Sequence, residues 1–139
     1  MNNNIERRIL NPKTLCEPLG LYNHAISVNA GRLLFLSGQV AVDCDKQLVG
    51  RDDIQRQTEQ VLENISNVLA GANASFQNVV KLTIYLTRTQ DVPGYAKTRT
   101  QFFERHYPDG DYPAAALVIV QQLLDPAWLI EVDAIAALP

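Results

Sequence analysis

Residues 54–86 constrain the fold most, because their apolar spacing changes from a helical period to a strand period. Asp52 and Asp53 precede this stretch as candidate N-caps, since a carboxylate accepts hydrogen bonds from the free N–H groups of a first helical turn. From Val79 to Leu86 every second residue is apolar, which predicts a half-buried strand. Before it, Gly71 supplies a stop signal for a helix whose apolar residues recur at helical spacing, at Ile54, Val61, Leu62, Ile65, Val68 and Leu69.

Residues 91–106 form a second segment with helical apolar spacing. Asp91 can cap its start, and Pro93 suits a first turn because its ring fixes a helical φ and it has no N–H to leave unpaired. The sequence therefore predicts two helices separated by one strand. One face of the second helix carries aromatic and imidazole rings, at Tyr95, Phe102, Phe103 and His106.

Five further apolar runs predict strands, at residues 24–29, 32–37, 39–42, 114–120 and 129–136. Ala30 and Gly31 separate the first two runs by the length of a tight turn, so we expect these runs to pair as a β-hairpin. The expected order is three strands, a helix, a strand, a helix and two strands. This order fits an α+β fold in which both helices lie on one face of a single mixed sheet.

No third helix is predicted to cover the opposite face of that sheet. The penultimate strand is apolar on both faces, with Ala115 and Leu117 on one side and Ala116 and Val118 on the other. We expect a sister subunit to cover the open face, because an extended apolar patch is typical of an interaction surface. A chain of 139 residues has the usual size of one domain, so residues 1–139 are predicted to form a single, self-associating domain.

The charge pattern argues against nucleic acid as a partner. The net charge is −3, and the 12 Lys and Arg residues are scattered rather than gathered in a stripe. The first residues lack the apolar segment of a signal peptide, and no run approaches the ~20 apolar residues of a membrane span. These features predict a cytoplasmic protein without a membrane partner.

The two cysteines, Cys16 and Cys44, are predicted to be reduced thiols, with a disulfide as the alternative, because nothing in the sequence indicates secretion. Their spacing, with no histidine at ligand distance in sequence, argues against a zinc site. The chain also lacks a glycine-rich phosphate loop and a nucleophile elbow. We therefore expect no metal and no cofactor.

Short patterns along nearly the whole chain together resemble the Rid (YjgF-like) family. None is specific alone, but their order and spacing carry the resemblance. The resemblance implies a chorismate-mutase-like fold, a homotrimer whose three sheets line a central barrel, and small-molecule ligands in clefts between subunits. It also implies hydrolysis of reactive enamines and imines, such as 2-aminoacrylate, to keto acids and ammonia. The patterns lie at residues 20–25, 34–39, 50, 57, 64–65, 71–72, 79–81, 102–103, 113–114 and 130–136.

The resemblance implies a catalytic role for Glu131 on the last strand, where a glutamate positions or activates the attacking water. It implies substrate binding by Tyr22 and by Ser37, Gly38 and Gln39, which close the pocket. The alternative for Glu131 is a hydrogen bond to the backbone or to another subunit. For Tyr22 the alternative is a packed ring with its hydroxyl in water.

Two positions depart from the family pattern. The family's arginine forks onto a substrate carboxylate, but Ala115 occupies its position, and Leu117 replaces the cysteine that is common two residues later. Ala115 and Leu117 are therefore expected to line a roomier and more apolar pocket. Arg99 or Lys97 on the second helix could supply the missing charge from a new direction, although charges on a helix face are more often solvated.

Two functions remain open. The first is a Rid-type deaminase, acting on an enamine or imine that is not anchored by the usual arginine, and it rests on Glu131 and Tyr22. The second is a non-catalytic homotrimer that binds a small metabolite or only assembles, and the loss of the arginine and the cysteine favours it. RNA cleavage, which is also linked to the family, is disfavoured by the acidic charge and the lack of a basic groove.

Overall fold

The computed structural model describes residues 5–139, and the order of the elements in it agrees with the α+β class expected from the sequence. The two helices alternate with the later strands, and short 3-10 turns at Phe76–Asn78 and Thr89–Asp91 precede β4 and α2. In chain order the elements are β1 (Glu6–Leu10), β2 (Ala25–Asn29), β3 (Arg32–Val40), α1 (Ile54–Gly71), β4 (Val79–Leu86), α2 (Val92–His106), β5 (Ala114–Ile119) and β6 (Ile130–Leu138).

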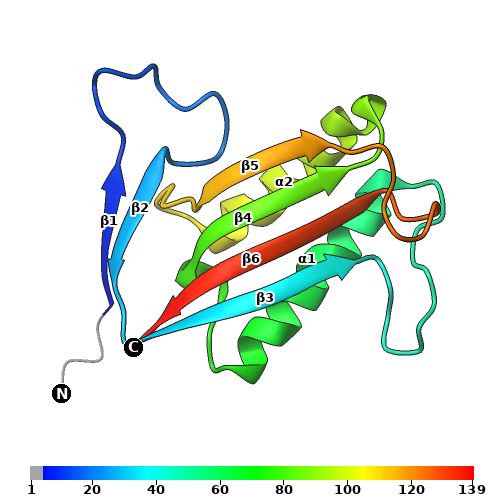
Figure 1. Cartoon of the computed structure of the whole chain (residues 1–139), viewed down its shortest axis with the longest axis horizontal. Helices are drawn as coiled ribbons and strands as arrows, with labels where there is room; N and C mark the ends of the chain where they lie inside the picture. Colours follow the sequence, from blue (N-terminus) through cyan, green and yellow to red (C-terminus); the bar gives the residue numbers. More distant parts are fainter. Residues whose placement is uncertain (1–4) are drawn as a thin grey trace.

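The main sheet has four strands in the order β3-β6-β4-β5. β4 and β5 run parallel, whereas β6 is antiparallel to both β3 and β4, so the sheet is mixed. Both helices lie behind the same face of this sheet (Figure 1). The expectation of two helices on one face is therefore confirmed, and within residues 5–139 no helix covers the other face, which we call the open face.

The predicted β-hairpin is wrong. β2 pairs with β1 in a separate two-stranded sheet, with Glu6 opposite Asn29, so the expectation of one continuous sheet is also wrong. Ala30 and Gly31 redirect the chain instead of closing a hairpin, since the N–H of Gly31 donates to the carbonyl of Leu138. β3 then takes β6 as its partner along its whole length, and a tertiary partner of this kind overrides a local turn signal.

Polar contacts hold the β1-β2 pair beside the start of β4 and β5 (Figure 1). Arg7 of β1 donates from Nε to Asp111 over 2.9 Å and from a terminal nitrogen to the carbonyl of Val79 over 2.9 Å. Asn23, just before β2, donates from Nδ2 to the carbonyl of Tyr112 over 2.7 Å. These contacts explain why β2 lies away from β3, and they rest on polar residues that carry no strand signal.

The predicted strand at residues 39–42 is also not a separate element. β3 continues to Val40, with a bulge between Leu36 and Gln39 where the register against β6 shifts. Such a bulge bends the strand and leaves an extra residue unpaired in the hydrogen-bond ladder. Ser37 and Gly38 lie in this bulge, which sets their backbone groups apart from the rest of the strand.

The start of α1 was correctly located from the sequence. Asp53 is the N-cap, and its Oδ1 accepts from the backbone N–H groups of Gln55 at 3.0 Å and Arg56 at 3.1 Å. Asp91 occupies the corresponding place before α2, but its carboxylate does not cap that helix. Instead it accepts two hydrogen bonds from Arg88, one from Nε at 2.6 Å and one from a terminal nitrogen at 3.1 Å.

Replacing Asp53 with alanine is expected to lower the free energy of unfolding by about 1 kcal/mol, because two N–H groups of α1 lose their acceptor. Urea denaturation at a fixed protein concentration measures this change. Glu63→Ala, an exposed position in the middle of the same helix, serves as the control and should change the free energy little. An equal loss in both variants would contradict the capping role.

The open face of the sheet is apolar near β3. Leu36 points toward the helices and is buried, so the alternation along β3 places Leu33 and Phe35 on the open face, where they are 52% and 70% exposed. Val118 of β5 lies on the same face and is 43% exposed. Large apolar side chains exposed on one sheet face are typical of an interaction surface.

Candidate functional site

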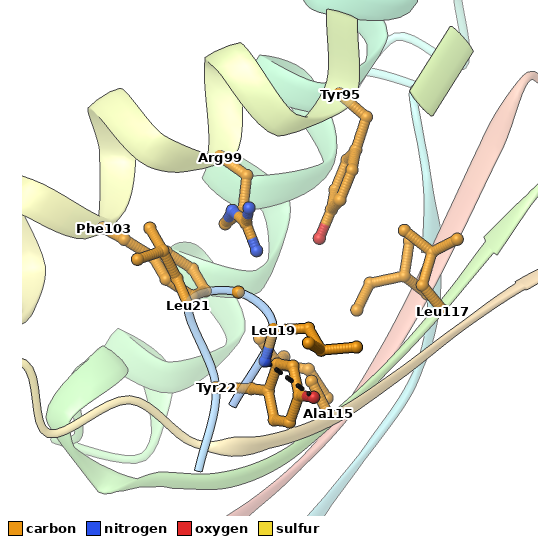
Figure 2. A pocket seen from close by; sticks show the side chains of 11 residues that line it. Leu19, Leu21, Tyr22, Tyr95, Arg99, Phe103, Ala115 and Leu117 are labelled. Atoms are coloured by element: carbon orange, nitrogen blue, oxygen red, sulfur yellow. Dashed lines mark hydrogen bonds between the residues drawn. The ribbon is translucent and has the colours of Figure 1, made fainter. Parts of the chain in front are cut away.

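A cavity of about 340 Å³ lies between α2 and the helix-facing side of β4 and β5. The loop between β1 and β2 forms its third wall (Figure 2). Arg99 is the only charged residue in its lining, and the other side chains are apolar or aromatic. The lining consists of Leu19, Gly20, Leu21, Tyr22, Leu82, Ile84, Tyr95, Arg99, Phe103, Ala115 and Leu117.

The strand register explains why two of the predicted site residues reach this cavity. Ala115 lies beside Leu82, and Leu117 lies beside Ile84, in the parallel β4-β5 pair. Leu82 and Ile84 are buried against the helices, so their neighbours on β5 face the same way. The small side chain of Ala115 leaves open a space that a long side chain at this position would fill.

Tyr22 reaches the cavity from the loop before β2. Its hydroxyl accepts a hydrogen bond from the N–H of Leu19 over 3.2 Å, which fixes the ring at the cavity wall (Figure 2). Asn23 anchors the same loop next to β5, since its N–H donates to the carbonyl of Pro113 over 3.2 Å. Tyr22 is therefore placed by the chain just before β5, close to Ala115 in space although far from it in sequence.

Two polar side chains of α2 enter the cavity. The guanidinium carbon of Arg99 lies 5.7 Å from the ring centre of Tyr95 and 5.6 Å from that of Phe103. The hydroxyl of Tyr95 points into the same space as the guanidinium nitrogens (Figure 2). Burial raises the pKa of Tyr95 to about 12, so this hydroxyl is protonated at neutral pH and can donate a hydrogen bond.

Of the two cations considered on the second helix, only Arg99 lines the cavity, while Lys97 is exposed. Tyr95, Arg99 and Phe103 follow one another at i, i+4 and i+8. Arg99 therefore lies on the aromatic face of α2. This spacing was visible in the sequence. A charged side chain on a helix is usually solvated, so the spacing alone does not predict that Arg99 lines a cavity.

Glu131 lies on the opposite side of the sheet from this cavity. It pairs with Tyr85 across β4 and β6, whereas its neighbour Val132 pairs with the helix-facing Ile84. The Glu131 carboxylate lies against the bulge of β3, where a Cβ added to Gly38 would overlap its Oε1. Glycine is therefore required at residue 38 for Glu131 to adopt this position.

Further polar groups surround Glu131 on the open face. The hydroxyl of Tyr85 donates to Oδ2 of Asp133 over 3.3 Å. The pKa of Tyr85 is raised, mainly by the negative charge of Asp133 and also by burial, by this hydrogen bond and by Glu131. Gln39, just after the bulge, faces the helices instead, and its Nε2 donates to the carbonyl of Ser37 over 3.2 Å. The bulge and these two carboxylates thus form a polar group beside the apolar residues of β3 on the open face.

All but one of the predicted site residues therefore fall into two groups within one chain. The helix-side group, in the cavity, comprises Tyr22, Ala115 and Leu117. The open-face group comprises Ser37, Gly38 and Glu131. Gln39 belongs to neither group, because it pairs with the helix-facing Val132 and lies beside Gln60 and Asn64 of α1. Beside the helix-side group and the candidate Arg99, the cavity is lined by seven residues that the sequence did not assign to the site: Leu19, Gly20, Leu21, Leu82, Ile84, Tyr95 and Phe103.

The histidines and cysteines lie elsewhere. A ring nitrogen of His106 contacts the carbonyl of Phe102 at 2.9 Å, and Nε2 of His24 contacts that of Cys16 at 2.8 Å. Cys16 and Cys44 are both free and exposed, as predicted. In residues 5–139 no cluster of three or more His, Cys, Asp or Glu could hold a metal ion. No helix in the same range is long and apolar enough to span a membrane.

Comparison with known proteins gives matches over most of the chain. A family model described as Endoribonuclease L-PSP matches residues 13–138. A RutC family protein of Pyrococcus horikoshii is 38% identical over 120 residues, which are 86% of this chain and 89% of that protein. The human 2-iminobutanoate/2-iminopropanoate deaminase is 28% identical over 112 residues, 80% of each chain.

Solved structures match as well. The Rid family protein YyfB from Yersinia pestis superposes with a TM-score of 0.84 at 34% identity, covering 95% of this chain and 98% of that one. Escherichia coli TdcF, solved with bound serine, superposes with a TM-score of 0.70 at 26% identity, covering 95% and 99%. Similarity of this extent covers the helices and both strand groups.

Proposed function

This chain belongs to the family described as Endoribonuclease L-PSP, the YjgF/Rid family, and on that premise we propose that it hydrolyses an enamine or imine of a small metabolite. The products are the corresponding carbonyl compound and ammonia. A human relative is named as a deaminase of 2-iminobutanoate and 2-iminopropanoate, which supports this reaction class. Because Ala115 stands where the family has its arginine, the substrate is not anchored from β5.

The observation that carries this proposal is the contact between Glu131 and Gly38. These residues come from β6 and β3, and the family resemblance implies that both belong to one site. Glu131 accepts a proton from a water molecule as the water oxygen adds to the C=N carbon, and the nitrogen takes up a proton. The hydroxyl proton of the resulting amino alcohol moves to the amino group as the C–N bond breaks, so ammonia leaves and a C=O bond forms. An enamine enters this sequence after it takes up a proton at carbon and becomes the imine.

We further propose that the working form is a homotrimer whose open faces line a central barrel. The helix-side group and the open-face group lie on opposite sides of one sheet, so a complete site needs the second group from a neighbouring chain. The exposed Phe35, Leu33 and Val118 supply the apolar surface that such packing buries. The ligand cleft then lies between subunits.

Replacing Glu131 with glutamine tests the catalytic role. Ammonia release from generated 2-aminoacrylate and from less charged enamines is expected to fall at least about 100-fold, because the amide cannot accept the proton from water. Asp133→Asn is the matched control, since the amide oxygen still accepts from Tyr85, and its activity should stay near that of the wild type.

Equal losses of ammonia release in Glu131→Gln and Asp133→Asn would contradict the assignment of Glu131 as the specific base. A wild-type protein that releases no ammonia from any of these substrates would contradict the enzyme proposal. The second candidate function, metabolite binding without catalysis, would then remain. It is favoured by the apolar Ala115 and Leu117 in the cavity lining, where the family resemblance implies an arginine and a cysteine.

A further inference from the structure

The position of Arg99 carries an energetic penalty, and the contacts of the folded chain do not explain why the residue lies there. Its Nε is buried and has no hydrogen-bond partner. Of the ion pairs formed among residues 5–139, none includes Arg99. A buried guanidinium nitrogen normally finds an acceptor, because leaving it unpaired forfeits its hydration without replacement.

The two aromatic contacts of Arg99 do not remove this cost. Tyr95 and Phe103 present their rings to the guanidinium at 5.7 and 5.6 Å, and such contacts stabilise the positive charge through the face of each ring. The N–H groups of a guanidinium lie in its own plane and need oxygen acceptors. In Figure 2 the guanidinium end of Arg99 faces the cavity, so a molecule bound there can offer acceptors to the terminal nitrogens, although not to the buried Nε.

A second donor is aimed at the same space. The hydroxyl of Tyr95 points into the cavity beside the guanidinium, four residues earlier on α2 (Figure 2). The charged guanidinium of Arg99 and the neutral hydroxyl of Tyr95 point into one space. Two such donors match a planar anion with two acceptor oxygens. A carboxylate has this geometry.

The remaining walls restrict what the carboxylate is attached to. Leu19, Ile84, Ala115 and Leu117 surround the space opposite Arg99, and among residues 5–139 no second cation lines the cavity. A second negative charge would therefore be desolvated against apolar side chains without a partner. An aliphatic group is favoured there, because its burial removes apolar surface from water.

We propose that this cavity binds a short aliphatic monocarboxylate, with its carboxylate held by Arg99 and the hydroxyl of Tyr95. The assignment rests on the proposed function, since it names the ligand class of the same site. Arg99 supplies from α2 the positive charge that Ala115 removes from β5. The carboxylate is therefore held at the helix wall, and the aliphatic part lies toward Leu19 and Leu117.

Titration calorimetry with 4-methylpentanoate and 4-methylpentanamide tests this proposal on the wild-type protein. The two probes have nearly the same shape and differ in charge. The acid is expected to bind at least about tenfold more tightly than the amide, since a charge-assisted fork exceeds a neutral hydrogen bond by that factor. Equal binding of acid and amide, or no binding of either, would overturn the proposal.

Arg99→Met adds a residue-specific test. It is expected to lose at least about tenfold in affinity for the acid and clearly less for the uncharged amide. Arg105→Met is the matched control, an exposed position in the last turn of the same helix, and should bind both probes as the wild type does. Acid binding that survives Arg99→Met would refute the assignment.

The stability of Arg99→Met separates a ligand-binding role from a structural one. If Arg99 serves the ligand, removing its unpaired Nε should leave the melting temperature without ligand equal or higher, and only the increase caused by the acid should disappear. A lower melting temperature without ligand would instead assign Arg99 to the fold. Neither measurement depends on turnover, so acid binding without ammonia release would contradict the proposed hydrolysis and leave the role of Arg99 intact.

Discussion

Phe35→Asp is expected to convert the assembled protein into a monomer. Phe35 is 70% exposed on the open face, and Leu33, on the same face, is 52% exposed. Burying a phenylalanine side chain contributes about 1.5 to 3 kcal/mol for each subunit, and a carboxylate in the same seam would lose its hydration without gaining a partner. Both effects act at once and favour dissociation.

Sedimentation velocity measures this change directly. Val68→Asp is the matched control, because Val68 is a 40% exposed apolar residue on α1, in the layer behind the sheet. The control is expected to remain assembled, while Phe35→Asp sediments as one chain. If the Phe35→Asp variant sediments as an assembled species, the open face is not the interface. Loss of ammonia release together with assembly would support a site shared between subunits.

Gln57→Leu is expected to lower the free energy of unfolding by about 3 to 5 kcal/mol, because one buried and two partly buried backbone groups lose their partner. The Gln57 side chain is fully buried on α1. Its Nε2 donates to the carbonyls of Gly50 at 3.1 Å and Ala127 at 3.0 Å. Its Oε1 accepts from the N–H of Leu129 at 2.8 Å, just before β6.

The measurement is urea denaturation at one protein concentration, because the stability of an oligomer depends on concentration. Gln55→Leu, an exposed glutamine in the first turn of the same helix, is the control and should change the free energy by less than about 0.5 kcal/mol. A loss below about 1 kcal/mol in Gln57→Leu would mean that water replaces the lost hydrogen bonds.

The helices and the central strands could be predicted because their apolar periods are long and unambiguous. α1 and β4 were located from spacing alone, and Asp53 marked the start of α1. β1 was missed because Glu6, Arg7 and Arg8 give it no apolar run. β2 was assigned the wrong partner because strand pairing depends on contacts between distant residues, here Arg7 with Asp111, which a local turn signal does not contain.

The candidate site was predictable in composition but not in arrangement. The resemblance identified Tyr22 and Ala115, which share the cavity, and also Glu131. Alternation along β6 could have placed Glu131 on the open face, but only once its register against β4 was known. Arg99 is a candidate from the sequence, but a charged residue on a helix is more often solvated, and only the fold brings it to the same cavity as Tyr22.

Multi-angle light scattering of the wild-type protein at micromolar concentration tests most directly whether sister chains cover the open face. A mass three times that of the 139-residue chain is expected, because the sheet has helices on only one side and leaves Phe35 in water on the other. A stable species with the mass of a single chain would contradict both the shared interface and the ligand cleft between subunits.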